Sequence, residues 1–210
     1  MKPQLISIYR KLFARFGPQH WWPADTPLEV MVGAILTQNT NWGNVEKAVG
    51  NLKRHTVLTL SGLHGLSQAR LASLIRPAGY YNIKSGRLKN FIDFFVKEYR
   101  GNIRETLSVE TPRLREQLLS VNGIGPETAD SILLYALGRP VFVVDAYTKR
   151  ILSRHGMAGI NDDYAAVQNL FMRNLDPDAR LFNEYHALLV RLGKDFCLKN
   201  KPKCETCPLR

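Results

Sequence analysis

Apolar residues recur at helical spacing along almost the whole chain. In the first seventeen residues they fall on one helical face: Leu5, Ile8, Tyr9, Leu12 and Phe16. Further helices are predicted over 25–37, 43–54, 67–75, 85–99, 112–121, 126–137, 162–175 and 178–196. The apolar run at 141–144 has strand composition, but it is too short and solitary to form a sheet. The pattern therefore predicts an all-α protein.

Residues at helix ends refine this picture. Asp25 is expected to cap the helix over 25–37, and Pro126 suits the first position of the helix over 126–137. Gly138 suits a left-handed residue at the end of that helix.

A glycine-rich segment, NGIGPETAD at 122–130, separates two of the predicted helices. Gly123 and Gly125 let the backbone turn sharply and approach another chain closely. The free N–H groups at the start of the next helix favour an anion such as a phosphate. Phosphate contacts position a protein on DNA without reading its sequence. The segment is therefore either a hairpin that holds nucleic acid or an ordinary connection between helices.

Composition narrows the class of protein. The chain has 210 residues and 45% hydrophobic content, enough to bury a core as one domain or two small lobes. Its formal net charge of +11 favours a polyanionic partner, although many basic proteins bind none. No apolar run approaches the roughly 18 residues that span a bilayer, and the N-terminus lacks the features of a secretion signal. We expect a cytoplasmic protein with no membrane contact.

Two further features carry chemistry. Asp145 follows the apolar run and precedes AYTKRIL, a position typical of a helix cap and compatible with a catalytic carboxylate. All three cysteines lie within the last fourteen residues: Cys197, Cys204 and Cys207. This clustering favours a metal site in a reducing compartment over disulfides.

Over nearly its whole length the chain resembles the helix-hairpin-helix DNA glycosylases of the endonuclease III superfamily. The motifs are LTQNT at 36–40, GYYNIKS at 79–85, NGIGPETAD at 122–130, VVDAY at 143–147 and the terminal cysteine pattern C-x6-C-x2-C. The resemblance implies two helical lobes with a DNA cleft between them. Residues 25–137 would form a helical barrel with the hairpin, and 1–24 with 138–210 the second lobe. It also implies a monomer that binds double-stranded DNA containing a damaged base.

The same resemblance gives roles to individual residues. Asp145 matches the catalytic aspartate, whose carboxylate stabilises positive charge on the sugar while the N-glycosidic bond breaks. Gln38 occupies the position of the side chain that fills the gap left by a flipped base. Glu127 stands where bifunctional relatives carry a lysine nucleophile, and glutamate cannot form a Schiff base. Lys84 and Lys149 do not occupy that position. We therefore predict a monofunctional enzyme that leaves an abasic site.

The substrate is inferred from HWWP at 20–23 and from Trp42, which resemble the bacterial 3-methyladenine DNA glycosylases of this superfamily. In that branch the base pocket would be lined by Trp21, Trp22, Pro23 and Trp42. An N3-alkylated adenine is cationic, so an indole face attracts it by roughly 0.5–2 kcal/mol per contact. Three alternatives stay open: aromatic side chains that only pack, a glycosylase for oxidised pyrimidines, and a non-catalytic DNA-binding module.

The cysteine pattern is most of the wider family's four-cysteine [4Fe–4S] site. The family's fourth ligand would lie three positions beyond Arg210. We expect a [4Fe–4S] cluster on Cys197, Cys204 and Cys207 that orders a basic loop and takes no part in the reaction. A longer natural chain, a non-cysteine fourth ligand, zinc with an outside ligand, or no metal at all are the alternatives.

Overall fold

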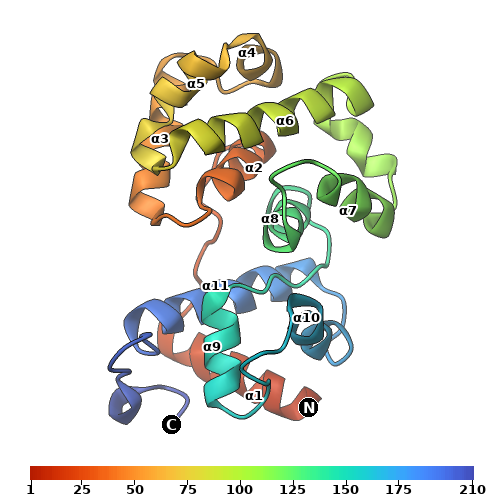
Figure 1. Cartoon of the computed structure of the whole chain (residues 1–210). Helices are drawn as coiled ribbons and strands as arrows, with labels where there is room; N and C mark the ends of the chain where they lie inside the picture. The colour runs from red at the N-terminus through yellow and green to blue at the C-terminus, as the bar shows by residue number, and fades with distance from the viewer. The chain divides into compact units, whose positions relative to one another are not determined.

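The computed structural model describes all residues 1–210, and it is built from helices with no strand (Figure 1). The predicted all-α class is confirmed. The α-helices are α1 (Lys2–Phe16), α2 (Pro27–Leu36), α3 (Trp42–Arg54), α4 (Leu60–Gly65), α5 (Gln68–Leu74), α6 (Tyr81–Tyr99), α7 (Thr111–Leu119), α8 (Pro126–Ser131), α9 (Ala146–Arg154), α10 (Tyr164–Met172) and α11 (Ala179–Asp195). Short 3-10 helices are η1 (Arg76–Ala78), η2 (Ile103–Ser108) and η4 (Cys204–Thr206), and η3 (Ile132–Ala136) is a single π-helical turn. None of the helices is both long and apolar enough to cross a membrane.

The chain forms two compact units, one of residues 1–22 with 138–210 and the other of residues 23–137. In the first unit α1 packs against α11. Leu5 and Leu12 on the predicted face of α1 are buried, and the Tyr185 hydroxyl of α11 donates to the Leu5 carbonyl at 2.8 Å. The N-terminal helix is thereby part of the same unit as the C-terminal segment.

The second unit is organised around α2. Every residue of this helix from Leu28 to Leu36 is buried, as expected for a helix that is apolar almost all round. Helices α3, α6 and α8 and the turn η3 pack against it. The one acid within it, Glu29, is neutralised by Lys53 of α3, with 2.6 Å between Oε1 and Nζ. This arrangement places the LTQNT segment directly at the end of the most buried helix.

Several helix ends differ from the sequence-based prediction. The cap of α2 is Thr26, whose Oγ1 accepts from the Glu29 N–H at 3.2 Å, and not Asp25, which pairs with Lys53. Helix α6 begins at Tyr81, four residues before the predicted start. Helix α4 was not predicted, because its six residues are too few to establish a helical period.

The predicted helix over 126–137 is wrong in its second half. Helix α8 ends at Ser131, and the chain continues as a wider π turn over Ile132–Ala136. Such turns are rare single-turn insertions in a helical path, so the apolar pattern of one segment did not predict this one. Gly138 then adopts the left-handed conformation expected of it, with φ +63°.

Lys84 ties the end of α2 to α6. Its side chain is buried, and Nζ donates to the carbonyl oxygens of Leu36 and Ala78, both at 2.8 Å. Burial, together with the smaller effect of the neighbouring Arg87 charge, lowers the pKa of this lysine to about 8. Both hydrogen bonds of the amine therefore go to backbone carbonyls of the fold.

Lys84 should therefore give the fold a pH dependence. Between about pH 8 and pH 10 the unfolded chain keeps the Lys84 proton, because its unfolded pKa is about 10.4, while the folded protein releases it. The unfolded state binds more protons in this window, so the free energy of unfolding rises with pH. Urea titrations should show wild type gaining stability over Lys84→Met as the pH rises from about 7.5 to about 10.

Lys53→Met is the control, because hydrogen bonds with Asp25 and Glu29 raise the pKa of Lys53. Its stability difference from wild type should stay constant over the same window. A constant difference for Lys84→Met as well would contradict the assignment.

Candidate active site and DNA-binding hairpin

An extended, buried segment leads to Asp145 in the first unit. Val141 to Val144 form no sheet, and their backbone polar groups bond to side chains of α10 instead. Gln168 donates to the Phe142 carbonyl at 2.7 Å, and the Val144 N–H donates to the Tyr164 hydroxyl at 3.3 Å. The segment is thus fixed along its length, and Asp145 is held at its end.

The two oxygens of the Asp145 carboxylate have different partners. Oδ1 accepts from the Thr148 N–H at 2.7 Å, so Asp145 caps α9 as its position predicts. Oδ2 lies 3.7 Å from Nε2 of His186, and the Asp145 side chain is 12% exposed. No lysine or arginine pairs with this carboxylate. The cap therefore fixes the carboxylate's orientation without cancelling its charge.

His186 was missed in the sequence. It lies on α11 and is buried, and burial lowers its pKa from the usual value of 6.5, with the Asp145 charge acting less strongly in the other direction. Burial therefore favours the neutral imidazole, which does not form a charged pair with the Asp145 carboxylate. Its spacing could have predicted that it is buried, because His186 falls between Phe182 and Leu189 on the apolar face of α11.

Close packing holds α9, which Asp145 caps, against α11, which carries His186. At Gly193 a Cβ would lie 2.4 Å from Cδ1 of Tyr147, so only glycine permits this approach. Arg150 of α9 donates to the carbonyls of Gly193 at 3.1 Å and Cys197 at 2.8 Å. Its positive charge thereby lies at the C-terminal end of α11, where the helix dipole favours a cation.

The predicted hairpin joins α7 and α8 in the second unit. Asp130, which is fully buried, receives two hydrogen bonds from Arg115 of α7, at 2.6 Å and 3.1 Å. Such a bidentate pair fixes the relative orientation of the two helices as well as their distance.

Gln38 of the LTQNT segment is bonded to this hairpin. Its Nε2 donates to the Gly123 carbonyl at 3.1 Å and to Thr128 Oγ1 at 2.9 Å, and Arg87 donates to its Oε1. Insertion of Gln38 into DNA stays a prediction, and it would exchange these hydrogen bonds for new ones.

The two hairpin glycines have different functions. Gly123 has φ +97°, and a Cβ there would lie 2.3 Å from Cγ of Arg87. Gly125 has φ −93°, which any residue adopts, and nothing lies within 4 Å of the position of a Cβ. The expectation that both glycines make the turn is therefore wrong for Gly125, which instead leaves open space in front of the hairpin.

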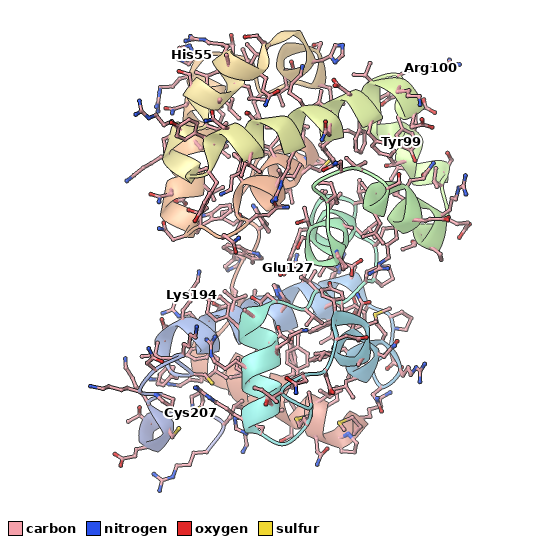
Figure 2. All side chains as sticks on the ribbon, viewed as in Figure 1. His55, Tyr99, Arg100, Glu127, Lys194 and Cys207 are labelled. Carbon is pink, nitrogen blue, oxygen red and sulfur yellow. The ribbon has the colours of Figure 1, made fainter.

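Glu127 and the two lysines Lys149 and Lys84 lie in different surroundings. Glu127 is exposed in the first turn of α8 (Figure 2). Lys149 is half-buried and donates to the Asp162 carbonyl at 3.0 Å, while Lys84 is enclosed by two carbonyls.

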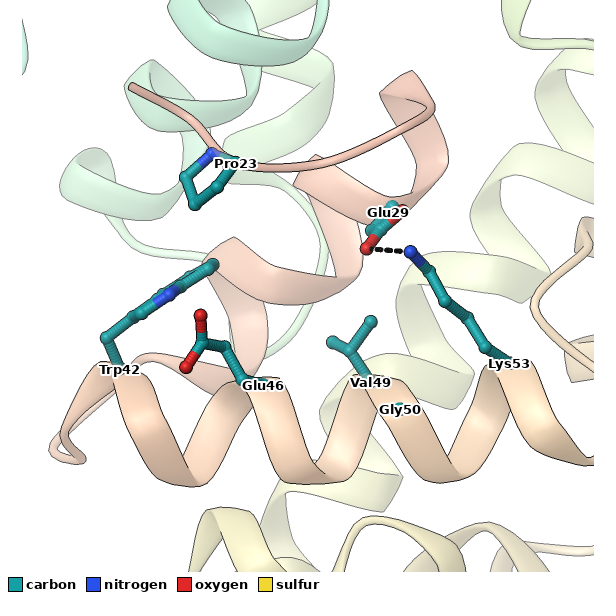
Figure 3. A pocket seen from close by; sticks show the side chains of 7 residues that line it. All are labelled: Pro23, Glu29, Trp42, Glu46, Val49, Gly50 and Lys53. Atoms are coloured by element: carbon teal, nitrogen blue, oxygen red, sulfur yellow. Dashed lines mark ion pairs between the residues drawn. The ribbon is translucent and has the colours of Figure 1, made fainter. Parts of the chain in front are cut away.

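The four predicted pocket residues fall into two groups. Pro23 and Trp42 line one cavity of about 230 Å³ in the second unit (Figure 3). Trp21 and Trp22 belong to the first unit, where their ring centroids are 5.1 Å apart and the Lys194 ammonium lies 6.0 Å from the Trp21 ring. A single pocket built from all four residues stays a prediction.

The three cysteines follow α11. Cys197 is buried and its Sγ accepts from Arg154 at 3.3 Å, whereas Cys204 is exposed. Cys207, labelled in Figure 2, is half-buried. No three histidine, cysteine or acidic side chains lie close enough together to hold a metal ion. As arranged, the thiols do not fit the four-thiolate set of a [4Fe–4S] cluster.

Comparison with known proteins gives the family. Residues 32–177 match the HhH-GPD superfamily of base excision DNA repair proteins. The chain belongs to this superfamily. The family predicted from the sequence motifs is confirmed, and the protein is a DNA glycosylase that acts on DNA.

Individual relatives agree with this assignment. The "putative DNA repair glycosylase" of Methanocaldococcus jannaschii is 49% identical over 208 residues, which are 98% of this chain and 94% of that protein. Endonuclease III of Thermotoga maritima is 27% identical over 204 residues, 97% of this chain and 89% of that protein.

Solved structures agree as well. The H. pylori 3-methyladenine DNA glycosylase bound to 1,N6-ethenoadenine has a TM-score of 0.78 at 28% identity, covering 92% of this chain and 96% of that one. A non-covalent endonuclease III–DNA complex has a TM-score of 0.85 at 22% identity, covering 100% and 93%, and shows the shared fold.

The contrast between the two glycines is testable. Gly123→Ala should lower the free energy of unfolding by about 2–5 kcal/mol, from about 1–2 for the left-handed backbone and about 1–3 for displacing Arg87. Gly125→Ala should stay within about 0.5 kcal/mol of wild type, because the backbone is ordinary and the methyl group meets nothing. Urea unfolding measures both, and equal losses would contradict this interpretation.

Proposed function

We propose that the protein is a monofunctional DNA glycosylase that removes alkylated bases, 3-methyladenine first, and leaves an abasic site. The observation that carries this proposal is the environment of Asp145: one oxygen is fixed by the helix cap, and the other faces a neutral histidine. A carboxylate that is held in place and keeps its charge suits a reaction in which positive charge develops on a sugar.

The chemistry follows from the bond that breaks. Cleavage of an N-glycosidic bond produces an oxocarbenium-like sugar, as in other glycoside hydrolyses. The Asp145 carboxylate stabilises this positive charge and orients or deprotonates the attacking water. One such electrostatic partner is typically responsible for about 10²–10³-fold in rate. Because the base must leave the helix stack first, the enzyme flips it out of the duplex.

Alkylated purines are favoured as substrates on two grounds. An N3-alkylated adenine carries a positive charge and is a good leaving group, so a lone aspartate suffices without a strong general acid. Its charge is also attracted by an indole face, and Trp42 lines the cavity of the second unit. The similarity to the H. pylori 3-methyladenine glycosylase supports this choice, whereas the relation to Endonuclease III of T. maritima supports oxidised pyrimidines as the second candidate. Chromatographic product profiles from alkylated and oxidised DNA distinguish the two.

The iron–sulfur cluster stays a prediction from the sequence. Cys197, Cys204 and Cys207 supply three thiols on one short segment, and Arg154 donates to the Cys197 sulfur. The proposed reaction requires no redox step, and none of its steps depends on the cluster.

The role of Asp145 is tested by Asp145→Asn. Asparagine is also a good cap, so α9 should remain folded while release of 3-methyladenine from methylated DNA falls by about 10²–10³-fold. DNA binding, measured by fluorescence anisotropy, should be retained. Asp163→Asn is the matched control, because Asp163 caps α10 in the same way, accepting from the Ala166 N–H at 2.7 Å. Equal base release by Asp145→Asn and wild type would overturn the catalytic role and favour a DNA-binding module.

The absence of lyase activity is tested separately. Wild-type protein incubated with abasic duplex and borohydride should form no covalent adduct, because the hairpin position holds Glu127 and the amines of Lys84 and Lys149 are bonded to carbonyls. A bifunctional glycosylase with a lysine at this position is the positive control. Rapid trapping by the wild-type protein would contradict monofunctional chemistry, and Lys84→Met and Lys149→Met would then locate the amine.

A further inference from the structure

The cavity that holds Pro23 and Trp42 has a charged floor (Figure 3). Glu46, Val49 and Gly50 of α3 line it, and Glu29 and Lys53 close its far end. Its volume of about 230 Å³ lies below the roughly 300–1,000 Å³ typical of drug-sized ligands, so it suits a single heterocycle. Gly50 keeps it open, because this position of α3 contributes no side chain.

Lys53 does not make this cavity positive. Its ammonium lies between two carboxylates, 2.8 Å from Asp25 and 2.6 Å from Glu29. Hydrogen bonds with these two acids raise the pKa of Lys53, so it remains charged, but one positive charge faces two negative ones. Of these groups only Lys53 and Glu29 line the cavity, so the positive charge at its far end is already balanced.

Glu46 adds a second negative charge that no cation balances. The helical neighbours of Glu46, three and four residues away, are Trp42, Gly43, Val49 and Gly50, none of which is charged. No ion pair joins its carboxylate to any lysine or arginine. Arg54, one turn beyond Gly50, directs its guanidinium to the Asn51 side chain. The carboxylate of Glu46 lies beside the indole of Trp42 on the cavity side of α3 (Figure 3).

We propose that Glu46 is a specificity-determining residue, which makes this cavity favour positively charged bases over neutral ones. The proposal rests on the proposed function, since N-alkylation at N3 or N7 of a purine nucleoside places a positive charge on the ring. Trp42 contributes its aromatic face to any flat base, charged or not, with a further gain for a cation. Glu46 contributes only to the cationic one. The pairing of an aromatic face with an unbalanced carboxylate would thus separate damaged from undamaged purines by charge.

The test compares one cationic and one neutral lesion. Single-turnover base release is measured on duplexes containing 3-methyladenine, which is cationic as the nucleoside, and 1,N6-ethenoadenine, which is neutral. Glu46→Gln keeps the shape and removes the charge. We expect it to slow release of 3-methyladenine about three- to tenfold, since Glu46 is exposed and partly screened, and to change release of the neutral lesion by less than about twofold. Glu46→Asp, which keeps the charge, should restore most of the ratio between the two lesions.

Glu98→Gln is the matched control, because it removes the same charge from an exposed site on α6, outside the cavity. It should leave the ratio unchanged. An equal effect of Glu46→Gln on both lesions, or no effect on either, would overturn the proposal while the proposed function stands.

A binding measurement keeps the two proposals distinguishable. Tryptophan fluorescence is titrated with a purine of fixed positive charge, the 3,9-dimethyladeninium ion, and with neutral 9-methyladenine. The wild type should prefer the cation, and Glu46→Gln should lose that preference. If the wild type released no alkylated base, the proposed function would fail, and this titration would still decide the charge preference. Equal affinities for the two purines would overturn it.

Discussion

The cap at the start of α9 determines what Asp145 can do. A carboxylate with both oxygens free would rotate, and the charge of one paired with lysine or arginine would be balanced by its partner. Here the Thr148 N–H holds one oxygen, and the other faces an imidazole that burial keeps neutral. The rest of the first unit serves this arrangement: the buried run before Asp145 is bonded to α10, and the glycine contact at Tyr147 brings α9 against the helix that carries His186.

In the second unit, buried polar groups hold the hairpin in one orientation through hydrogen bonds. Arg115 and Asp130 join α7 to α8, Gln38 bonds to the turn, and Lys84 closes the end of α2 beneath LTQNT. Each of these groups is satisfied by hydrogen bonds, which buried polar atoms require. Such contacts specify one geometry, since they are lost if a helix shifts, whereas apolar contacts tolerate small movements.

Charge is distributed differently in the cavity beside Trp42. Lys53 there is surrounded by carboxylates, so even in a strongly basic protein this surface is locally negative. A net charge of +11 suits the attraction of a DNA backbone, but it says nothing about the sign of the potential where a single base would bind. The net charge depends only on the composition of the chain. The local potential depends on which charged side chains the fold makes neighbours.

The sequence by itself determined the helical class, the family and the cap at Asp145, because each depends on residues close together in the chain: apolar spacing, turn glycines and an acid before a helix. Only the tertiary structure decided that His186 faces Asp145, that Gln38 bonds to the hairpin, that Lys84 is enclosed, and that Gly123 but not Gly125 requires glycine. It also assigned Trp21 and Trp42 to different units and placed Glu46 in a cavity where no lysine or arginine pairs with its carboxylate. The reason is physical: local patterns fix the backbone, while pKa values, close contacts and unbalanced charge depend on side chains distant in sequence that packing brings together.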